Sequence, residues 1–200
     1  MRIHRSAAVL ACVTGFALLG TACNENNAQG GGTETPTKGP APTASKPVDG
    51  DAGKTLALGE RTTVSYQRGS GRGTVLSVTA KSVTKGTVSD LDAVRLDAEE
   101  RGMQPYYVTF DFENTGKSTL EYPFLAGAAK LRDSRGEDGT STVTVGDEVK
   151  ECPAAPVDSF APGAKVTQCA VFLLPEGEQP SVIVYTGDYD KEPVFWRAGK

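Results

Sequence analysis

Two clusters of carboxylates are the side chains of this 200-residue sequence best suited to chemistry. The first cluster is Asp90, Asp92, Asp97, Glu99 and Glu100, and the second is Asp188, Asp190 and Glu192, next to Tyr189. Carboxylate oxygens are ligands for Ca²⁺. The first cluster lacks EF-hand spacing, because Arg101 stands where the bidentate Glu belongs when Asp90 is counted first. A solvated acidic loop is the alternative in both places, and we expect no metal and no other cofactor.

Catalysis by histidine is excluded if the N-terminal segment is removed, because the single histidine is His4. Without imidazole there is no Ser-His-Asp or Cys-His nucleophile and no histidine metal ligand. The sequence has no G-x-S-x-G motif, no P-loop and no dinucleotide fingerprint. A hydrolase that uses two carboxylates needs them about 5–10 Å apart in a cleft, and nothing in the acidic spacing indicates such a pair. We therefore expect that the protein is not an enzyme.

Residues 1–22 have the pattern of a secretory signal peptide. Arg2 and Arg5 precede an apolar run that is too short to span a bilayer, and small residues follow it. A segment of this kind is removed on export and contributes nothing to the mature fold.

Cys23 directly follows the small residues Gly20, Thr21 and Ala22. This placement resembles the lipobox of bacterial lipoproteins, although Gly20 stands where that motif has a large aliphatic residue. The resemblance implies that Cys23 is diacylated, as with palmitate, and anchors the protein at the extracytoplasmic face of the cell membrane. Each buried CH₂ contributes about 0.8 kcal/mol, and two or more acyl chains anchor stably. The alternative is ordinary cleavage after Ala22 that leaves Cys23 unmodified.

Cys152 and Cys169 are the cysteines that remain for the folded part of an exported chain. In an oxidising compartment a disulfide is the default for such a pair. A loop of this size is stabilised by about 3 kcal/mol in the chain-entropy model. A metal or redox role is disfavoured, because the pair has no C-x-x-C spacing and no histidine nearby.

The charge of the chain argues against nucleic acid as a partner. The formal net charge is −4, and loss of Arg2 and Arg5 with the signal peptide makes it more negative. A mildly acidic protein has no electrostatic footprint for nucleic acid or anionic lipid headgroups. Any membrane attachment would therefore come from lipid on Cys23.

Residues 23–54 are predicted to be a disordered tether and residues 55–200 a folded domain. The tether is rich in Gly, Pro and Thr and has almost nothing to bury. The domain consists of short β-rich runs separated by turn residues. The expected strands are 62–66, 73–83, 104–113, 120–125, 129–133, 141–145, 165–174, 181–185 and 194–196. Residues 89–101 are expected to form a short helix or an acidic loop. Many short strands indicate an all-β sandwich.

The clearest strand, 104–113, alternates between two faces. Tyr106, Val108, Phe110 and Phe112 fall on one face, and Tyr107, Thr109, Asp111 and Glu113 on the other. A period of two predicts one face in the core and one in water. We expect a candidate binding surface that includes Tyr107, Asp111 and Glu113, with Tyr189 from the second acidic cluster. The alternative is that these residues only keep the sheet soluble.

Most other aromatic side chains are expected in the core. This set is Tyr106, Phe110, Phe112, Tyr122, Phe124, Phe160, Phe172 and Trp196.

The order of several motifs resembles one known family. The segment 106–116 ends in Asn-Thr-Gly, Tyr122-Pro123-Phe124 follows, and Ala161-Pro162-Gly163 precedes a closing strand that contains Cys169. This order is similar to that of the telokin-like, immunoglobulin-like extracellular domain of bacterial lipoproteins. The resemblance covers roughly 55–185 and implies an immunoglobulin-like β-sandwich in the cell envelope. Most members of that family have no defined function, so it implies no activity.

The sequence thus predicts a membrane-anchored lipoprotein whose β-sandwich binds a protein, a peptide or a cell-wall component. The first alternative is a supporting envelope lipoprotein without a specific ligand. The second is a hydrolase that uses carboxylates. A binding module is expected to expose a contiguous apolar or aromatic patch. Its partner and its oligomeric state are left open.

Overall fold

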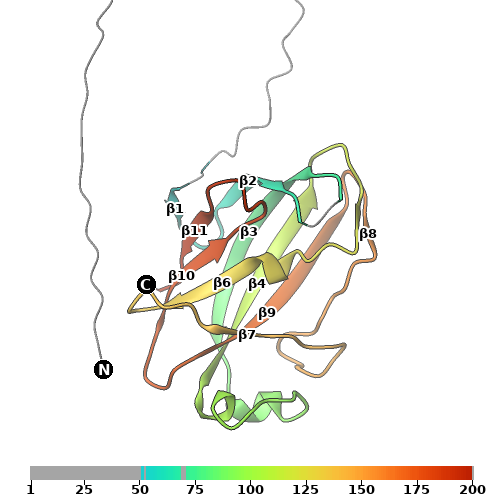
Figure 1. Ribbon diagram of the computed structural model, residues 1–200. Helices are drawn as coiled ribbons and strands as arrows, with labels where there is room; N and C mark the ends of the chain where they lie inside the picture. The colour runs from blue at the N-terminus through green and yellow to red at the C-terminus, as the bar shows by residue number, and fades with distance from the viewer. Residues whose placement is uncertain (1–50, 52, 69–70, 200) are drawn as a thin grey trace, which may run out of the picture. The chain divides into compact units, whose positions relative to one another are not determined.

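A computed structural model describes residues 51, 53–68 and 71–199, and its regular elements are β-strands and three short 3-10 helices (Figure 1). The predicted signal peptide 1–22, Cys23 and most of the predicted tether 23–54 lie outside the described residues. Within the described part, no helix is long and apolar enough to cross a membrane.

The larger sheet has five antiparallel strands in the order β2-β3-β4-β9-β7. They are β2 (Arg61–Tyr66), β3 (Thr74–Lys85), β4 (Gln104–Asn114), β9 (Lys165–Leu174) and β7 (Thr140–Thr142). The alternation of apolar and polar residues predicted these long strands, because successive side chains point to opposite faces of a sheet.

The second sheet has four strands in the order β1-β11-β10-β6, and only β1 and β11 run parallel among its pairs. They are β1 (Thr55–Leu56), β11 (Val194–Arg197), β10 (Pro180–Tyr185) and β6 (Ala129–Asp133). A separate pair joins β5 (Leu120–Glu121) to β8 (Ser159–Phe160).

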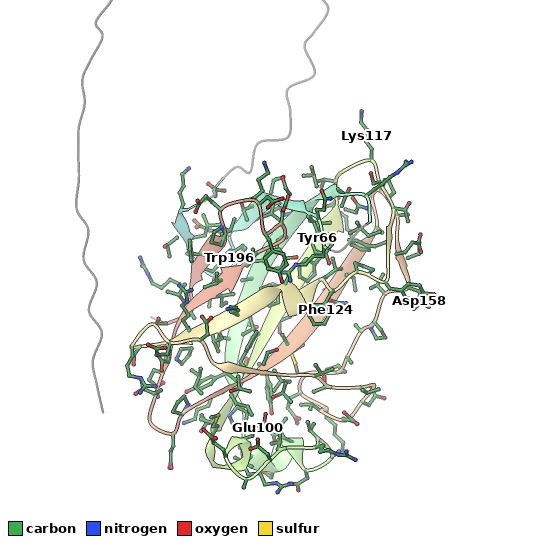
Figure 2. The ribbon with its side chains drawn as sticks, in the orientation of Figure 1. Tyr66, Glu100, Lys117, Phe124, Asp158 and Trp196 are labelled. Carbon is green, nitrogen blue, oxygen red and sulfur yellow. A yellow bond between two sulfur atoms is a disulfide. The ribbon has the colours of Figure 1, made fainter. Side chains whose placement is uncertain are left out.

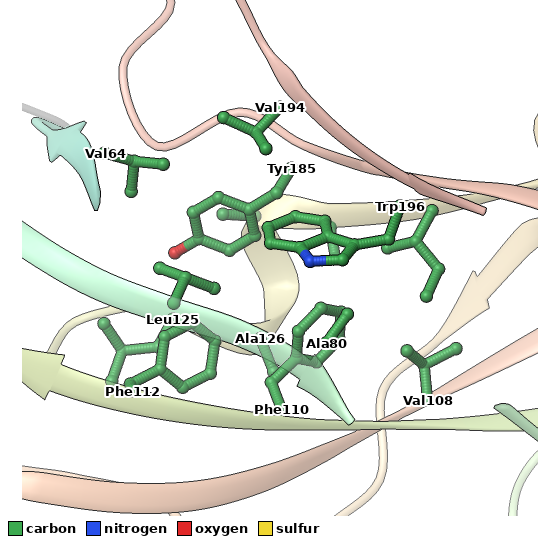
Figure 3. Packing of buried hydrophobic residues seen from close by; sticks show 14 of the residues in the cluster. Val64, Ala80, Val108, Phe110, Phe112, Leu125, Ala126, Tyr185, Val194 and Trp196 are labelled. Carbon is green, nitrogen blue, oxygen red and sulfur yellow. The ribbon is translucent and has the colours of Figure 1, made fainter. Parts of the chain in front are cut away.

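The core lies between the two larger sheets (Figure 3). Phe110 and Phe112 from β4 stack with ring centroids 5.7 Å apart, and Tyr185 from β10 lies 5.8 Å from Phe112. Trp196 from β11 is fully buried, and its Nε1–H donates a hydrogen bond to the carbonyl of Glu60 at 2.9 Å. Buried side chains from both sheets exclude water from one shared layer, which confirms the predicted all-β sandwich.

A second apolar cluster covers part of the outer face of the larger sheet. It contains Leu91, Val94, Leu96, Tyr107, Val149, Cys152, Val171 and Leu173. The covering segment carries η1 (Val88–Leu91) and η2 (Glu100–Gly102), drawn in green beyond the ends of β3 and β4 (Figure 1). The expected short helix or acidic loop at 89–101 is therefore a partly 3-10 segment that packs on the sheet.

Two predicted strands are shorter in the structure. The run 120–125 gives strand only at β5, and the chain then turns into η3 (Ala126–Ala128). The run 141–145 gives strand only at β7, which pairs with Val171–Leu173 of β9. Residues 165–170 of β9 consequently pair with β4 alone among the described strands.

The predicted disulfide is confirmed. Cys152 and Cys169 are bonded, with Cα atoms 5.2 Å apart. The bond attaches the loop that follows β7 to the middle of β9, beside the second apolar cluster.

Candidate ligand-binding site

Tyr107 is not part of an exposed surface, so its predicted place in the candidate binding surface is wrong. Its side chain is only 3% exposed, because the 3-10 segment and the loop around Cys152 cover that part of β4. Its hydroxyl donates a hydrogen bond to Asp90 Oδ2 at 2.9 Å. Burial and this carboxylate raise the pKa of Tyr107. The outer face of β4 is thus wet at one end and buried at the other.

Asp111 and Glu113 do lie on the wet part of that face, where they form ion pairs. Asp111 Oδ2 is 3.2 Å from Lys81 Nζ, and its Oδ1 accepts a hydrogen bond from Thr167 Oγ1 at 2.6 Å. Glu113 Oε2 is 3.5 Å from Lys165 Nζ. Exposed pairs of this kind contribute little stability. The lysines neutralise the charges of both carboxylates. This pairing fits the alternative that Asp111 and Glu113 only keep the sheet soluble.

Tyr189 is exposed but lies with different partners. The guanidinium of Arg68 stands 4.3 Å from the centroid of the Tyr189 ring, and Arg68 Nη1 donates a hydrogen bond to its hydroxyl. Within the described residues, no hydrogen bond, ion pair or ring contact joins Tyr189 to Tyr107, Asp111 or Glu113. The structure therefore does not bring the four predicted residues together into one site.

The carboxylates of the first acidic cluster cap local backbone groups. Asp90 accepts hydrogen bonds from the amide and hydroxyl of Thr87, and these bonds and the Tyr107 hydroxyl lower the pKa of Asp90. Asp97 Oδ1 accepts the amides of Glu99 and Glu100. Among the described residues, no three His, Cys, Asp or Glu side chains lie close enough together to hold a metal ion.

The best candidate for a binding site is an apolar groove at one edge of the sandwich. It has a volume of about 420 Å³ and is lined by the segments 122–127, 141–146, 154–158 and 168–171. Of the six large hydrophobic side chains exposed in the described part, four line this groove: Tyr122, Phe124, Val143 and Val145. Figure 2 labels Phe124 and Asp158, which both belong to its walls. We call this recess the apolar groove.

The groove exists because β7 is short. Pairing of β7 with β9 ends at Thr142 and Val171. Beyond that point the chain from Val143 onward leaves the sheet, and a recess opens along β9. The disulfide at Cys169 fixes the returning loop to β9.

Gln168 of β9 fastens two of the four walls. Its Oε1 accepts the amide of Ala126 at 3.0 Å, and its Nε2 donates to the carbonyl of Ala155 at 2.6 Å. These bonds satisfy both ends of the side-chain amide and link two loops to one strand. These two walls are therefore held in place without a ligand.

The local backbone places the Phe124 and Tyr122 side chains in the groove wall. The Phe124 ring lies against Gly127 at the position that a Cβ atom would fill. Tyr122 has φ of 46°, a left-handed conformation that is rare for residues other than glycine. Such a conformation costs on the order of 1–3 kcal/mol and is concentrated at functional sites. The amide of Tyr122 donates to the carbonyl of Asp158 at 2.7 Å, which joins this wall to the next.

The prediction that Tyr122 and Phe124 belong to the core is wrong, since they are 77% and 58% exposed. The sequence did carry a signal that could have found them. Tyr122 and Phe124 flank Pro123, which restricts strand pairing. Val143 and Val145 likewise follow the end of the strand region and precede Gly146, a turn position with positive φ.

Comparison with known proteins adds no family assignment. No family model matches the sequence, and no curated protein matches it. The YjhA protein from Bacillus subtilis is similar in structure, with a TM-score of 0.46 and 17% identity over 72% of this chain and 99% of YjhA. An uncharacterized β-sandwich protein from Clostridium difficile has a TM-score of 0.43 and 14% identity over 80% of this chain and all of its own. The two sheets and the buried layer between them make this protein an all-β sandwich, and the apolar groove lies at one of its edges.

Proposed function

We propose that this chain is an extracytoplasmic lipoprotein whose β-sandwich binds a segment of another protein in the apolar groove. The observation that carries the proposal is the gathering of four large exposed apolar side chains around one recess. Exposed apolar side chains scattered singly are ordinary, whereas a contiguous group marks an interaction site. The fixed walls and the backbone strain at Tyr122 favour binding without large rearrangement.

The location of the protein forms the second part of the proposal. The signal peptide 1–22 and the lipobox-like Cys23 favour attachment to the outer face of the cell membrane. The order of motifs that resembles the telokin-like, immunoglobulin-like domain of lipoproteins favours the same location. Incorporation of labelled palmitate tests the anchor. We expect that Cys23→Ser abolishes incorporation, and unchanged labelling would contradict the assignment.

Site-specific photo-cross-linking in living cells tests the groove. A photoreactive amino acid replaces Val143 in one variant and Glu176, exposed on the turn after β9, in the control. We expect a discrete protein adduct from position 143 that is absent from position 176. The same adduct is expected to weaken in a variant that also carries Phe124→Ser. If positions 143 and 176 give the same adducts, the groove is not the binding surface, and a supporting role without a specific ligand is favoured.

A further inference from the structure

A second recess adjoins the apolar groove and carries two arginines. It has a volume of about 270 Å³ and is lined by Tyr66, Arg68, Gly71, Arg72 and residues 119–124. The segment Tyr122-Pro123-Phe124 lines both recesses and therefore forms the wall between them. Tyr66 and Phe124, which face this recess, are labelled in Figure 2. We call this recess the arginine pocket.

Arg68 carries a half-buried positive charge in this pocket. Its Nη1 donates to the Tyr189 hydroxyl and its Nη2 to the carbonyl of Thr186, which are both neutral groups. Its Nε is buried and has no hydrogen-bond partner in the part of the chain that the structure describes. Among the described residues, Arg68 forms no ion pair. A charge withdrawn from water is unfavourable unless an opposite charge or hydrogen bonds compensate it. The Nε atom is covered by protein, so the arrangement offers an incoming anion the positive charge of the guanidinium and not this donor.

Arg72 adds a second positive charge, and Glu121 limits the total. Arg72 has neither an ion pair nor a hydrogen bond within the part of the chain that the structure describes. Glu121 also lines the pocket, and its Oε1 accepts a hydrogen bond from Ser159 Oγ at 3.4 Å. Two arginines and one glutamate leave one net positive charge, which matches a singly charged carboxylate better than a doubly charged phosphate. Arginine also binds carboxylates with favourable fork geometry.

We propose that the arginine pocket binds the side-chain carboxylate of an Asp or Glu in the same protein segment that fills the apolar groove. This inference rests on the proposed function, because it assigns chemistry to that partner. Alternate side chains of an extended segment lie on one face, about 7 Å apart. A segment that crosses the Tyr122-Pro123-Phe124 wall therefore presents an acidic residue to one recess and an apolar residue, two positions away, to the other.

Peptide selection against the full-length chain tests the proposal. The peptides come from a random library, and their C-termini are blocked so that only side chains supply carboxylates. We expect enriched peptides to carry Asp or Glu two positions from a large apolar residue. Synthetic copies with Gln or Asn in place of the acid are expected to bind about tenfold more weakly or worse, as for loss of a charged hydrogen bond.

Arg72→Gln is the main variant, because the Arg72 side chain forms no hydrogen bond or ion pair with the described residues and its loss should leave the fold unchanged. It is expected to weaken the binding of the acidic peptides at least several-fold. The affinity of their Gln copies is expected to stay unchanged. Arg68→Gln is expected to act in the same direction with a larger effect. Arg101→Gln, an exposed arginine outside both recesses, is the matched control and is expected to change nothing.

The possible failures are distinguishable. If Val143→Ser abolishes peptide binding and Arg72→Gln does not, the carboxylate assignment is wrong and the apolar groove remains the binding site. Enriched peptides without an acidic residue would lead to the same conclusion. Peptides that respond to neither variant, or no enrichment at all, would overturn both the pocket and the proposed function.

Discussion

The hydroxyl of Tyr107 on β4 donates a hydrogen bond to Asp90 of η1 at 2.9 Å, and this bond joins the larger sheet to the segment that covers its outer face. Asp90 also holds the amide and hydroxyl of Thr87, so one carboxylate organises the start of the covering segment and docks it on the sheet. A residue from the polar side of the sequence pattern thus becomes part of a second core.

Shortening Tyr107 should therefore destabilise the fold. We expect Tyr107→Ala to lower the free energy of unfolding by about 3–5 kcal/mol, as for other large-to-small changes of buried aromatics. Tyr107→Phe keeps the ring and removes the hydroxyl, so it should cost about 1 kcal/mol. Urea denaturation measures both values. Equal losses for Ala and Phe, or no loss for either, would contradict the burial of this ring.

Asp133 should make the protein sensitive to acid. Its carboxylate is 1% exposed and accepts hydrogen bonds from the Arg135 side chain and from the amides of Arg135 and Glu137. Burial opposes ionisation, but these bonds outweigh it and lower the pKa of Asp133 from its ordinary value. A lowered pKa in the folded state means stability that is present above the unfolded-state pKa and is lost as the pH falls through the folded-state pKa.

The corresponding measurement compares wild type with Asp133→Asn between pH 7 and pH 2. Asp133→Asn should reduce the unfolding free energy at pH 7 and flatten its decline below pH 4, because the variant has no carboxylate to protonate there. Glu176→Gln, at an exposed turn, serves as a control that keeps the wild-type slope. An unchanged slope in Asp133→Asn would show that other carboxylates govern acid unfolding.

Loss of the Cys152–Cys169 bond should loosen one wall of the apolar groove. The bond closes a loop with a sequence separation of 17 residues, for which the chain-entropy model gives about 3 kcal/mol. We expect the double change to serine to lower the unfolding free energy by about that amount and to speed amide exchange in residues 143–156. Cys23→Ser should change neither property, since Cys23 is proposed as a lipid site. Uniform exchange changes across both sheets would argue against a local role.

Gly127→Ala should displace Phe124. A Cβ at position 127 would meet the ring of Phe124, which must then swing away from the groove wall. We expect modest loss of stability together with clear loss of the photo-cross-link formed from position 143. Gly102→Ala is the matched control, because a Cβ there meets nothing within 4 Å. A wild-type cross-link in Gly127→Ala would exclude Phe124 from the binding surface.

The long strands were predictable because their information is local. The alternation of Val108, Phe110 and Phe112 with polar neighbours identifies an inward face whatever lies opposite, and these three side chains are buried in the structure. The pairing of Cys152 with Cys169 was predictable for a simpler reason. Residues 55–200 contain one pair of cysteines, so a disulfide within this domain has a single possible pairing.

The groove was not predictable from such patterns. Tyr122 and Phe124 look like core residues by type, and their exposure follows from where β5 ends and from the left-handed backbone at Tyr122. The two recesses also combine segments that are distant in the sequence, such as Arg68 with residues 119–124. The spacing of residues along the sequence does not show which of these distant segments lie side by side in the fold.

The class of fold, the principal strands and the disulfide could be predicted without coordinates. Period-two alternation is visible within short segments, and the disulfide follows from the number of cysteines. The folded structure, in contrast, sets which surfaces stay exposed. It covered Tyr107 with a segment from another part of the chain and left Phe124 in water beside the arginine pocket. Exposure depends on what packs against a side chain, and that packing is set by contacts between residues far apart in the sequence.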